Sequence, residues 1–268
     1  MSRLSNEKVF THSQYKTDEN LVVRKNYNSF LVPHFDLTEE VIKIIKKSNV
    51  SVLDTGCGNG DLLIRLRKSE FKGELKGIEL SKGMLKSAIK QNKKEKLNIK
   101  FISGNVEDLP FENNSFDIVI SKHVFHHLKD IQKGVDEIHR CLKNNGTLIV
   151  VLNSKDDKKK LTICEDIICK KYHLKIKHGR DVANIENIVK FLKGFNVTKV
   201  EYIKGTISKP ELFPARFESF RDFYQPQPSN ETWEKIMKDV DAFVKDSIKS
   251  EGKFVEKRVM GIIVAKRK

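Results

Sequence analysis

A chain of 268 residues, with 38% hydrophobic and 32% charged residues, has the size and composition of one elaborated globular domain. No apolar run approaches the ~20 residues that a membrane-spanning helix needs, and we expect no membrane span. The net charge of +15 suggests an acidic partner such as nucleic acid, but lysine supplies 41 of the 51 basic residues and arginine, which binds phosphate in bidentate fashion, only 10.

The N-terminal segment is polar and has no apolar signal-peptide core, so we expect a cytoplasmic protein. The four cysteines form no C-x-x-C pair, and no nearby histidine completes a zinc pattern. We therefore predict buried thiols and no metal site. The cysteines are Cys57, Cys141, Cys164 and Cys169.

The first predicted elements are helical. One helix covers part of residues 21–30, and a second runs over residues 39–47, with Thr38 as its N-cap, acids in its first turn and lysines in its last.

The next stretch, residues 51–63, reads as an apolar strand, a glycine turn and the start of a helix. Gly56, Gly58 and Gly60 allow positive φ and let the backbone approach a ligand closely. Asp54 places a carboxylate beside the crevice where nucleotide-like ligands bind in open α/β sheets. The helix that follows covers residues 61–69.

Further strands are predicted at residues 75–80, 99–104, 113–121 and 147–152, and helices at 82–91 and 131–142. Asn145-Gly146 is expected to close the last of these helices. Strand and helix thus alternate five times, which predicts a doubly wound sheet. Glu79 ends the second strand, where an acid can bind both hydroxyls of a ribose.

After residue 152, a charged loop precedes a predicted helix at residues 161–172. Further helices are predicted at residues 187–192 and 231–249, and strands at 197–203 and 259–265. The aromatic stretch from Leu212 to Tyr224 places Phe213, Phe217, Phe220 and Tyr224 near one helical face. It predicts either a core seam or a wall of a substrate pocket.

Five features follow one another in order: D-x-G-x-G-x-G, an acid ending strand two, an L-P-F block, S-F-D-x-V and H-H-L. In this order they resemble class I S-adenosylmethionine (SAM)-dependent methyltransferases, in the methyltransferase type 11 or ubiquinone/menaquinone methyltransferase-like superfamily. The resemblance covers residues 50–152 well and the C-terminus weakly.

The resemblance implies an α/β fold: a Rossmann-like, mostly parallel, seven-stranded sheet whose antiparallel last strand lies between strands five and six, with helical additions. It also implies an N-terminal cap over residues 1–35 and a SAM-binding core over 36–155. Residues 156–268 would complete the sheet and add helical insertions around a substrate pocket.

The resemblance further implies which residues hold SAM. The glycine turn would hold the methionine and ribose end, Met84 would pack on adenine, and Asn105, which stands where the family has aspartate, would accept from the adenine amino group. The Val106 N–H would serve adenine N1. The full predicted cofactor set is Asp54, Gly56, Cys57, Gly58, Gly60, Glu79, Leu80, Met84, Asn105, Val106, Ser121 and Lys122.

A histidine near the methyl donor could act as a general base. His123 and His126 are the predicted catalytic residues, with His126 preferred over its neighbour His127, because consecutive residues cannot point both rings the same way. His12 and Tyr15 are weaker candidates.

The leading function is methyl transfer to an O, N or C atom of a small molecule. An RNA methyltransferase is the alternative that the charge favours, although Ser121-Lys122-His123-Val124 stands where an N-P-P-Y-type tetrapeptide would be. A non-catalytic SAM-binding or partner-binding protein is a third interpretation. The oligomeric state stays open.

Overall fold

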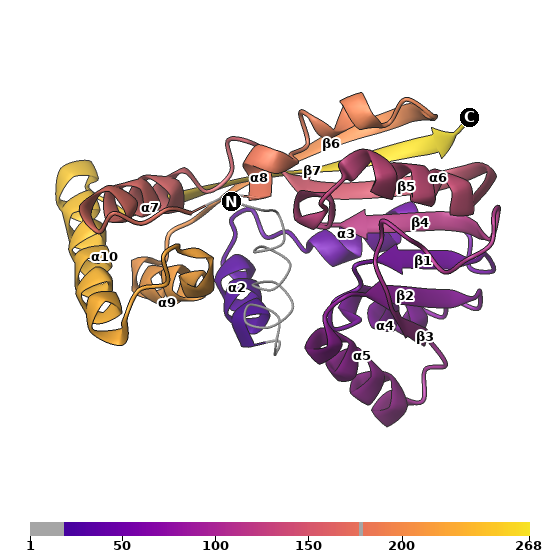
Figure 1. Cartoon of the computed structure of the whole chain (residues 1–268), viewed down its shortest axis with the longest axis horizontal. Helices are drawn as coiled ribbons and strands as arrows, with labels where there is room; N and C mark the ends of the chain where they lie inside the picture. The colour runs from indigo at the N-terminus through magenta and orange to yellow at the C-terminus, as the bar shows by residue number, and fades with distance from the viewer. Residues whose placement is uncertain (1–18, 177–178) are drawn as a thin grey trace.

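The computed structural model describes residues 19–176 and 179–268, so the candidates His12 and Tyr15 lie outside the described residues. Within the described part of the chain, seven strands form one sheet in the order β3-β2-β1-β4-β5-β7-β6. Strands β1 to β5 pair in parallel, and β7 runs antiparallel between β5 and β6, as predicted (Figure 1). The strands are β1 (Val52–Thr55), β2 (Leu75–Glu79), β3 (Lys100–Ser103), β4 (Phe116–Lys122), β5 (Leu142–Asn153), β6 (Phe195–Ile207) and β7 (Glu256–Arg267).

Helices pack on both faces of the sheet, because its strands are apolar on both sides. In β1, Leu53 belongs to the core cluster that contains α6, whereas its neighbour Val52 belongs to the cluster that contains α3 and α4. The helices are α2 (Glu19–Ser29), α3 (Leu37–Ile44), α4 (Asp61–Lys68), α5 (Lys82–Glu95), α6 (Ile131–Cys141), α7 (Lys159–Lys171), α8 (Gly179–Val182), α9 (Phe213–Glu218) and α10 (Asn230–Glu251), with short 3-10 turns η2 (Phe125–His127), η3 (Ile188–Phe191), η4 (Pro210–Leu212) and η5 (Arg221–Phe223).

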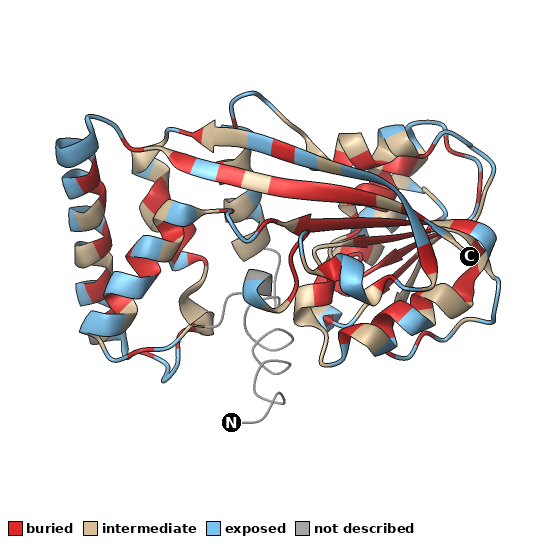
Figure 2. Cartoon of the chain, turned by 90° about the horizontal axis from the view of Figure 1, so that it is seen from above, coloured by how far each residue is buried: buried red, intermediate tan, exposed pale blue. Residues whose placement is uncertain are grey.

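Helices α7, α9 and α10 form a helical lobe at one end of the sheet, and α2 lies between this lobe and the strands (Figure 1). The lobe has its own apolar core, in which Phe213, Phe217 and Tyr224 are fully buried around Trp233. Along these helices, buried residues alternate with exposed ones (Figure 2). The core-seam interpretation of the aromatic stretch therefore holds for three of its four aromatic residues.

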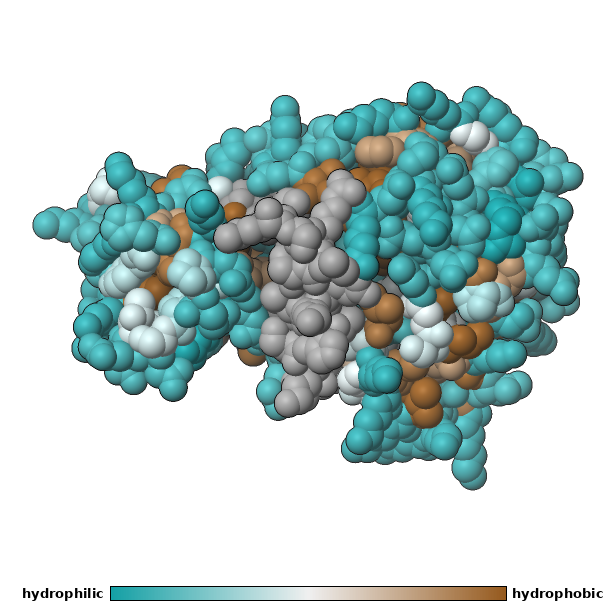
Figure 3. Space-filling view, viewed as in Figure 1, coloured by the Kyte–Doolittle hydropathy of each residue, from teal (hydrophilic) through white to brown (hydrophobic). Residues whose placement is uncertain are grey.

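Hydrophilic residues cover most of the face shown in Figure 3. Across the described residues, no helix combines the length and the apolar character needed to cross a bilayer.

Two predicted boundaries were wrong. Asp36, not Thr38, caps α3, because its Oδ1 accepts from the backbone N–H groups of Thr38 (2.9 Å) and Glu39 (3.1 Å). Strand β5 begins at Leu142, directly after α6, so Asn145-Gly146 lies inside the strand rather than closing the helix. Asn145 adopts the positive φ there (60°) that asparagine tolerates.

Two other expectations need adjustment. The chain joins β3 to β4 through a loop without a helix, so strand and helix alternate four times rather than five. The helix expected at residues 187–192 is the single 3-10 turn η3. The β3–β4 loop carries Asn105 and Val106, and its irregular backbone can place them at the sheet edge where a helix could not.

Candidate functional site

A cavity of about 520 Å³, cavity 1, lies at the carboxyl ends of β1, β2 and β4. The glycine turn forms one wall, with Gly56 and Gly58 at φ of +68° and +57°. A Cβ on Gly56 would lie 2.5 Å from Val124 Cγ2, so only glycine lets the turn approach the segment that follows β4. A Cβ on Gly58 would meet only Met84 Cε, at 3.7 Å. Gly58 thus leaves the room that a ligand needs.

Glu79 ties this turn to the end of β2. One carboxylate oxygen accepts from the Gly58 N–H at 2.9 Å, and the other accepts from the Ser81 N–H at 2.8 Å. Burial raises the pKa of Glu79, while these backbone donors lower it. The Leu80 N–H also bonds to this carboxylate, which still keeps acceptor capacity for a ligand hydroxyl, as the predicted ribose contact requires.

Asp54, at the end of β1, is 2% exposed and lines the same cavity. Among the described residues, its Oδ1 has no hydrogen-bond partner. Burial is the main cause that raises its pKa to about 7; the Lys122 charge opposes this rise, and the carboxylates of Glu79 and Asp61 add to it. The site therefore holds a carboxyl group that a cationic ligand group would ionise and satisfy.

The residues predicted to contact adenine also line this cavity. Met84, Asn105, Val106 and the half-exposed Leu80 line cavity 1 together with Cys57. Asn105 Oδ1 accepts from the Glu107 N–H at 3.0 Å, so one of its two lone pairs is already used.

Two predicted cofactor residues do not line the cavity. Ser121 is fully buried within β4, where it pairs with Thr55 of β1. Gly60 is the N-cap of α4 at φ +80°, and a Cβ there would come within 2.7 Å of Phe101 Cζ and 3.0 Å of Ala88 Cβ. Gly60 is therefore needed for packing of the turn against β3 and α5.

A second cavity of about 490 Å³, cavity 2, lies between the sheet, α2 and the helical lobe. The two cavities share one wall, to which Lys122, His123, His126 and His127 contribute. The side chains that line cavity 2 from the lobe and its connections include Lys158, Leu161, Glu165, Ile176, Arg216, Phe220 and Phe223. Phe220, the fourth aromatic residue of the predicted seam, is thus a pocket wall.

The histidines of the shared wall differ from expectation. His126 and His127 both line the two cavities, with ring centroids 3.9 Å apart, so the prediction that only one of them faces the pocket was wrong. The 3-10 turn η2, tighter than an α-helix, brings them together. Burial lowers the pKa of all three histidines, and Lys158 helps to lower that of His126 to about 3. They are therefore neutral at physiological pH.

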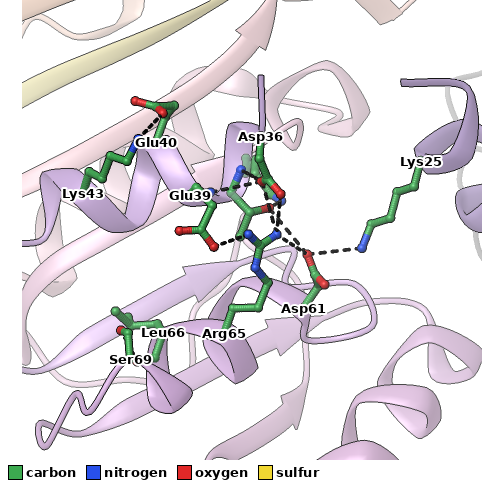
Figure 4. Close-up of polar contacts among 11 residues, drawn as sticks. Lys25, Asp36, Glu39, Glu40, Lys43, Asp61, Arg65, Leu66 and Ser69 are labelled. Atoms are coloured by element: carbon green, nitrogen blue, oxygen red, sulfur yellow. Dashed lines mark hydrogen bonds and ion pairs between the residues drawn. The ribbon is translucent and has the colours of Figure 1, made fainter. Parts of the chain in front are cut away.

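Helices α2 and α3 also contribute side chains beside the cavities. The sequence did not predict which of their residues would do so. Lys25 of α2 bonds to Asp61 of α4 at 3.2 Å, and both residues line the two cavities (Figure 4). Arg65 of α4 bonds to Asp36 at 3.0 Å and to Glu39 of α3. These ion pairs connect α2, α3 and α4 beside the cavities, and only the tertiary fold brings them together.

The family profile described as a methyltransferase domain matches residues 53–150. The 2-phytyl-1,4-naphtoquinone methyltransferase of Nostoc sp. is 33% identical over 39% of this chain, which spans 47% of that protein. A second relative is YrhH of Bacillus subtilis, which is named as a methyltransferase. It is 30% identical over 52% of this chain, and this chain spans 73% of YrhH. The chain thus spans about half of one relative and nearly three quarters of the other.

Solved structures support the same fold. YcgJ of Bacillus subtilis superposes with a TM-score of 0.57 at 17% identity, covering 86% of this chain and 97% of that one. SpnF, a cyclase, superposes equally well at 18% identity, covering 86% of this chain and 79% of that one. At such identities the likeness shows the fold alone. The profile, the YrhH match and the ordered motifs around cavity 1 show that the chain belongs to the class I SAM-dependent methyltransferases.

Proposed function

We propose that this protein transfers a methyl group from SAM, bound in cavity 1, to a small-molecule acceptor bound in cavity 2. The wall shared by the two cavities is the observation that carries the proposal, because it places a donor and an acceptor on either side of the same residues. An acceptor with an apolar or aromatic ring would suit Phe220 and Phe223. The naphthoquinone in the Nostoc relative's name is one example of such a ring.

The residues of cavity 1 fit SAM. Glu79 would accept from the ribose hydroxyls, Met84 and Leu80 would contact the adenine ring, and Asp54 would accept from the ammonium group. SAM supplies a methyl group on a sulfonium sulfur and leaves as a neutral thioether. The protein's own contribution is to align the acceptor and to receive its proton where the attacking atom carries one.

His126 is our preferred candidate to receive that proton, with His123 beside it. Both are neutral, as a base must be, but burial and Lys158 make His126 a weak base in the free protein. A negative charge in cavity 2 would raise its basicity. We expect His126→Ala to lower kcat at least tenfold with little change in SAM affinity, measured by initial rates and calorimetry. An unchanged kcat would remove His126 from the chemistry.

The two alternatives are less well supported. The relatives that match give no support to RNA methylation, for which the net charge remains the only argument. A non-catalytic role has no support from the relatives, which are named as methyltransferases, and the occurrence of the fold in a cyclase shows only that it also serves another reaction.

Methyl-tritiated SAM incubated with a small-metabolite extract and, separately, with total RNA distinguishes these functions. We expect label in the organic-extractable metabolite fraction. Label in RNA would support the alternative enzyme, and SAM binding without transfer to either would support the non-catalytic role.

Cofactor binding can be tested separately. We expect Glu79→Ala and Gly58→Val to weaken SAM binding more than tenfold in calorimetry, because the first removes the ribose acceptor and the second fills the turn. Glu74→Ala, at the other end of the same strand region, is the matched control and should bind normally. Unchanged affinity in both folded variants would contradict the assignment of cavity 1.

A further inference from the structure

Among the described residues, cavity 2 is lined by more cationic than acidic side chains. Seven described cations line it, against the three described carboxylates of Asp36, Asp61 and Glu165. The cations are Arg24, Lys25, Arg65, Lys122, Lys158, Arg216 and Arg258. Asp36 and Asp61 already bond to Arg65 and Lys25 at the α3–α4 end. The excess therefore lies at the other end, beside the helical lobe.

Arg216 of α9 is the centre of this excess. Its side chain is 3% exposed, and no described carboxylate forms a salt bridge with it. Its Nη1 has no hydrogen-bond partner among residues 19–176 and 179–268. The guanidinium lies 4.7 Å from the centroid of the Phe220 ring, an interaction that does not neutralise charge. A buried guanidinium without a paired carboxylate destabilises a folded protein unless a ligand supplies the negative charge and the hydrogen-bond acceptors.

The neighbours of Arg216 add to the positive potential. Arg24 of α2 lies 4.3 Å from the same Phe220 ring, and Lys158 lies 5.9 Å from it. Burial, together with the charges of Arg258 and Arg24, lowers the pKa of Arg216 to about 9, although the Asp157 carboxylate acts in the opposite direction. Burial and these arginines also lower the pKa of Lys158 to about 7. Three cations thus converge on one ring and repel one another.

Among the described residues, the buried carboxylate of Asp157 offsets part of this positive charge. Asp157 accepts from Arg258 Nε at 2.9 Å and from the Val259 N–H at 2.8 Å, and its other oxygen lies 3.7 Å from Lys158. It therefore balances Arg258 first. Glu165 lines the cavity from α7, and its charge raises the pKa of Tyr224 inside the helical lobe.

We propose that the methyl acceptor carries an anionic group, a carboxylate or a phosphate, which binds between Arg216, Arg24 and Lys158. The rest of the acceptor is apolar, because Leu31, Leu161, Phe220, Phe223 and Met260 form the neighbouring walls. Arg216 supplies a planar pair of donors that matches either group. This inference rests on the proposed function and defines the class of its substrate.

Three probes of one size test it: 2-naphthoate, 2-naphthyl phosphate and the neutral 2-naphthamide. Each is titrated into the full chain saturated with S-adenosylhomocysteine, and binding is measured by calorimetry. We expect at least one anion to bind at least tenfold more tightly than the amide. The tighter of the two anions identifies the carboxylate or the phosphate as the preferred group.

Two variants of Arg216 and one control locate the effect. Arg216→Met should abolish the preference for the anion, and Arg216→Lys should restore part of it. Arg221→Met is the matched control, since Arg221 follows on the same segment but bonds to Asn230 and does not line cavity 2. Thermal unfolding gives an independent readout: Arg216→Met should leave the Tm unchanged or raise it, because it removes an unbalanced buried charge.

Equal affinity for the three probes, including no detectable binding of any, overturns the proposal. So does an Arg216→Met variant that keeps the preference for the anion. A wild-type chain that fails to bind S-adenosylhomocysteine contradicts the proposed function instead, so the two failures are distinguishable.

Discussion

At the scale of single residues, cavity 1 contains two carboxyl groups whose desolvation the protein compensates to different extents. Asp54 is the less compensated of the two, because an acid that is almost fully buried keeps an oxygen without a hydrogen-bond partner in the described chain. Glu79 differs, since backbone N–H groups already hold its carboxylate. Asp54 therefore lowers the stability of the ligand-free protein and favours binding of a cationic group, whereas Glu79 also stabilises the turn.

The raised pKa of Asp54 predicts how SAM binding depends on pH. The free protein holds a proton there up to pH of about 7, whereas a bound cation favours the carboxylate, so binding below pH 7 must release that proton. We expect SAM affinity to fall by up to ~10-fold per pH unit below 7 and to level off above it. Calorimetry from pH 5 to 8.5 measures this.

Asp54→Asn should flatten that profile, and Asp108→Asn, an exposed aspartate outside cavity 1, should leave it unchanged. The contribution of Asp54 to the stability of the ligand-free protein depends on pH in the opposite direction. Because folding raises the pKa of Asp54 from 3.8, its contribution to stability falls as pH rises from about 4 to 7. The ligand-free Asp54→Asn variant should therefore gain on the order of 1–3 kcal/mol at pH 8. A profile that stays steep in Asp54→Asn would assign the titration to another group.

At the scale of elements, the glycine turn between β1 and α4 has two separate tasks. Gly56 and Gly58 shape the cavity wall, and Gly60 allows α4 to begin against Phe101 and Ala88. The D-x-G-x-G-x-G pattern does not distinguish these tasks, since each glycine has positive φ. The neighbours of each glycine, which only the packed structure supplies, separate them.

A matched pair of substitutions tests this division. Gly60→Ala should lose about 2–4 kcal/mol of unfolding free energy, from positive φ and the contacts with Phe101 and Ala88. Gly58→Ala should lose only ~1–2 kcal/mol, from φ alone. Affinity for S-adenosylhomocysteine should reverse the order, with Gly58→Ala weakened more than tenfold and Gly60→Ala within threefold. Urea unfolding and calorimetry give the two quantities, and the same order in both would contradict the division.

At the scale of the whole molecule, cavity 2 exists because the helical lobe, α2 and the sheet meet. Arg258 on β7 connects these parts: its guanidinium bonds to Asp157 before α7 and to Asn28 of α2. Arg24 of α2 in turn donates to Ser219, directly after α9. These contacts join segments up to 230 residues apart in the chain.

Two buried arginines should therefore respond in opposite ways to the same change. Arg258→Met leaves Asp157 buried without its main partner and should lose ~3–5 kcal/mol of unfolding free energy. Arg216→Met, which removes a charge that no described carboxylate pairs, should be neutral or stabilising. Urea unfolding of both variants at pH 7 measures the difference. Equal losses would mean that Arg216 is balanced in the folded chain after all.

Much of this protein follows from its sequence alone. The apolar strands, the glycine turn and Glu79 at a strand end act locally, so spacing predicted the parallel part of the sheet, whereas the antiparallel last strand and most of the cofactor wall were implied by the resemblance to class I methyltransferases. Cavity 2 was beyond such reasoning. Lys25, Lys158, Arg216 and Arg258 are scattered along a lysine-rich chain in which no local pattern marks a cation as buried. Burial and the absence of a paired carboxylate arise only when distant segments pack together, and these two properties give Arg216 its proposed role.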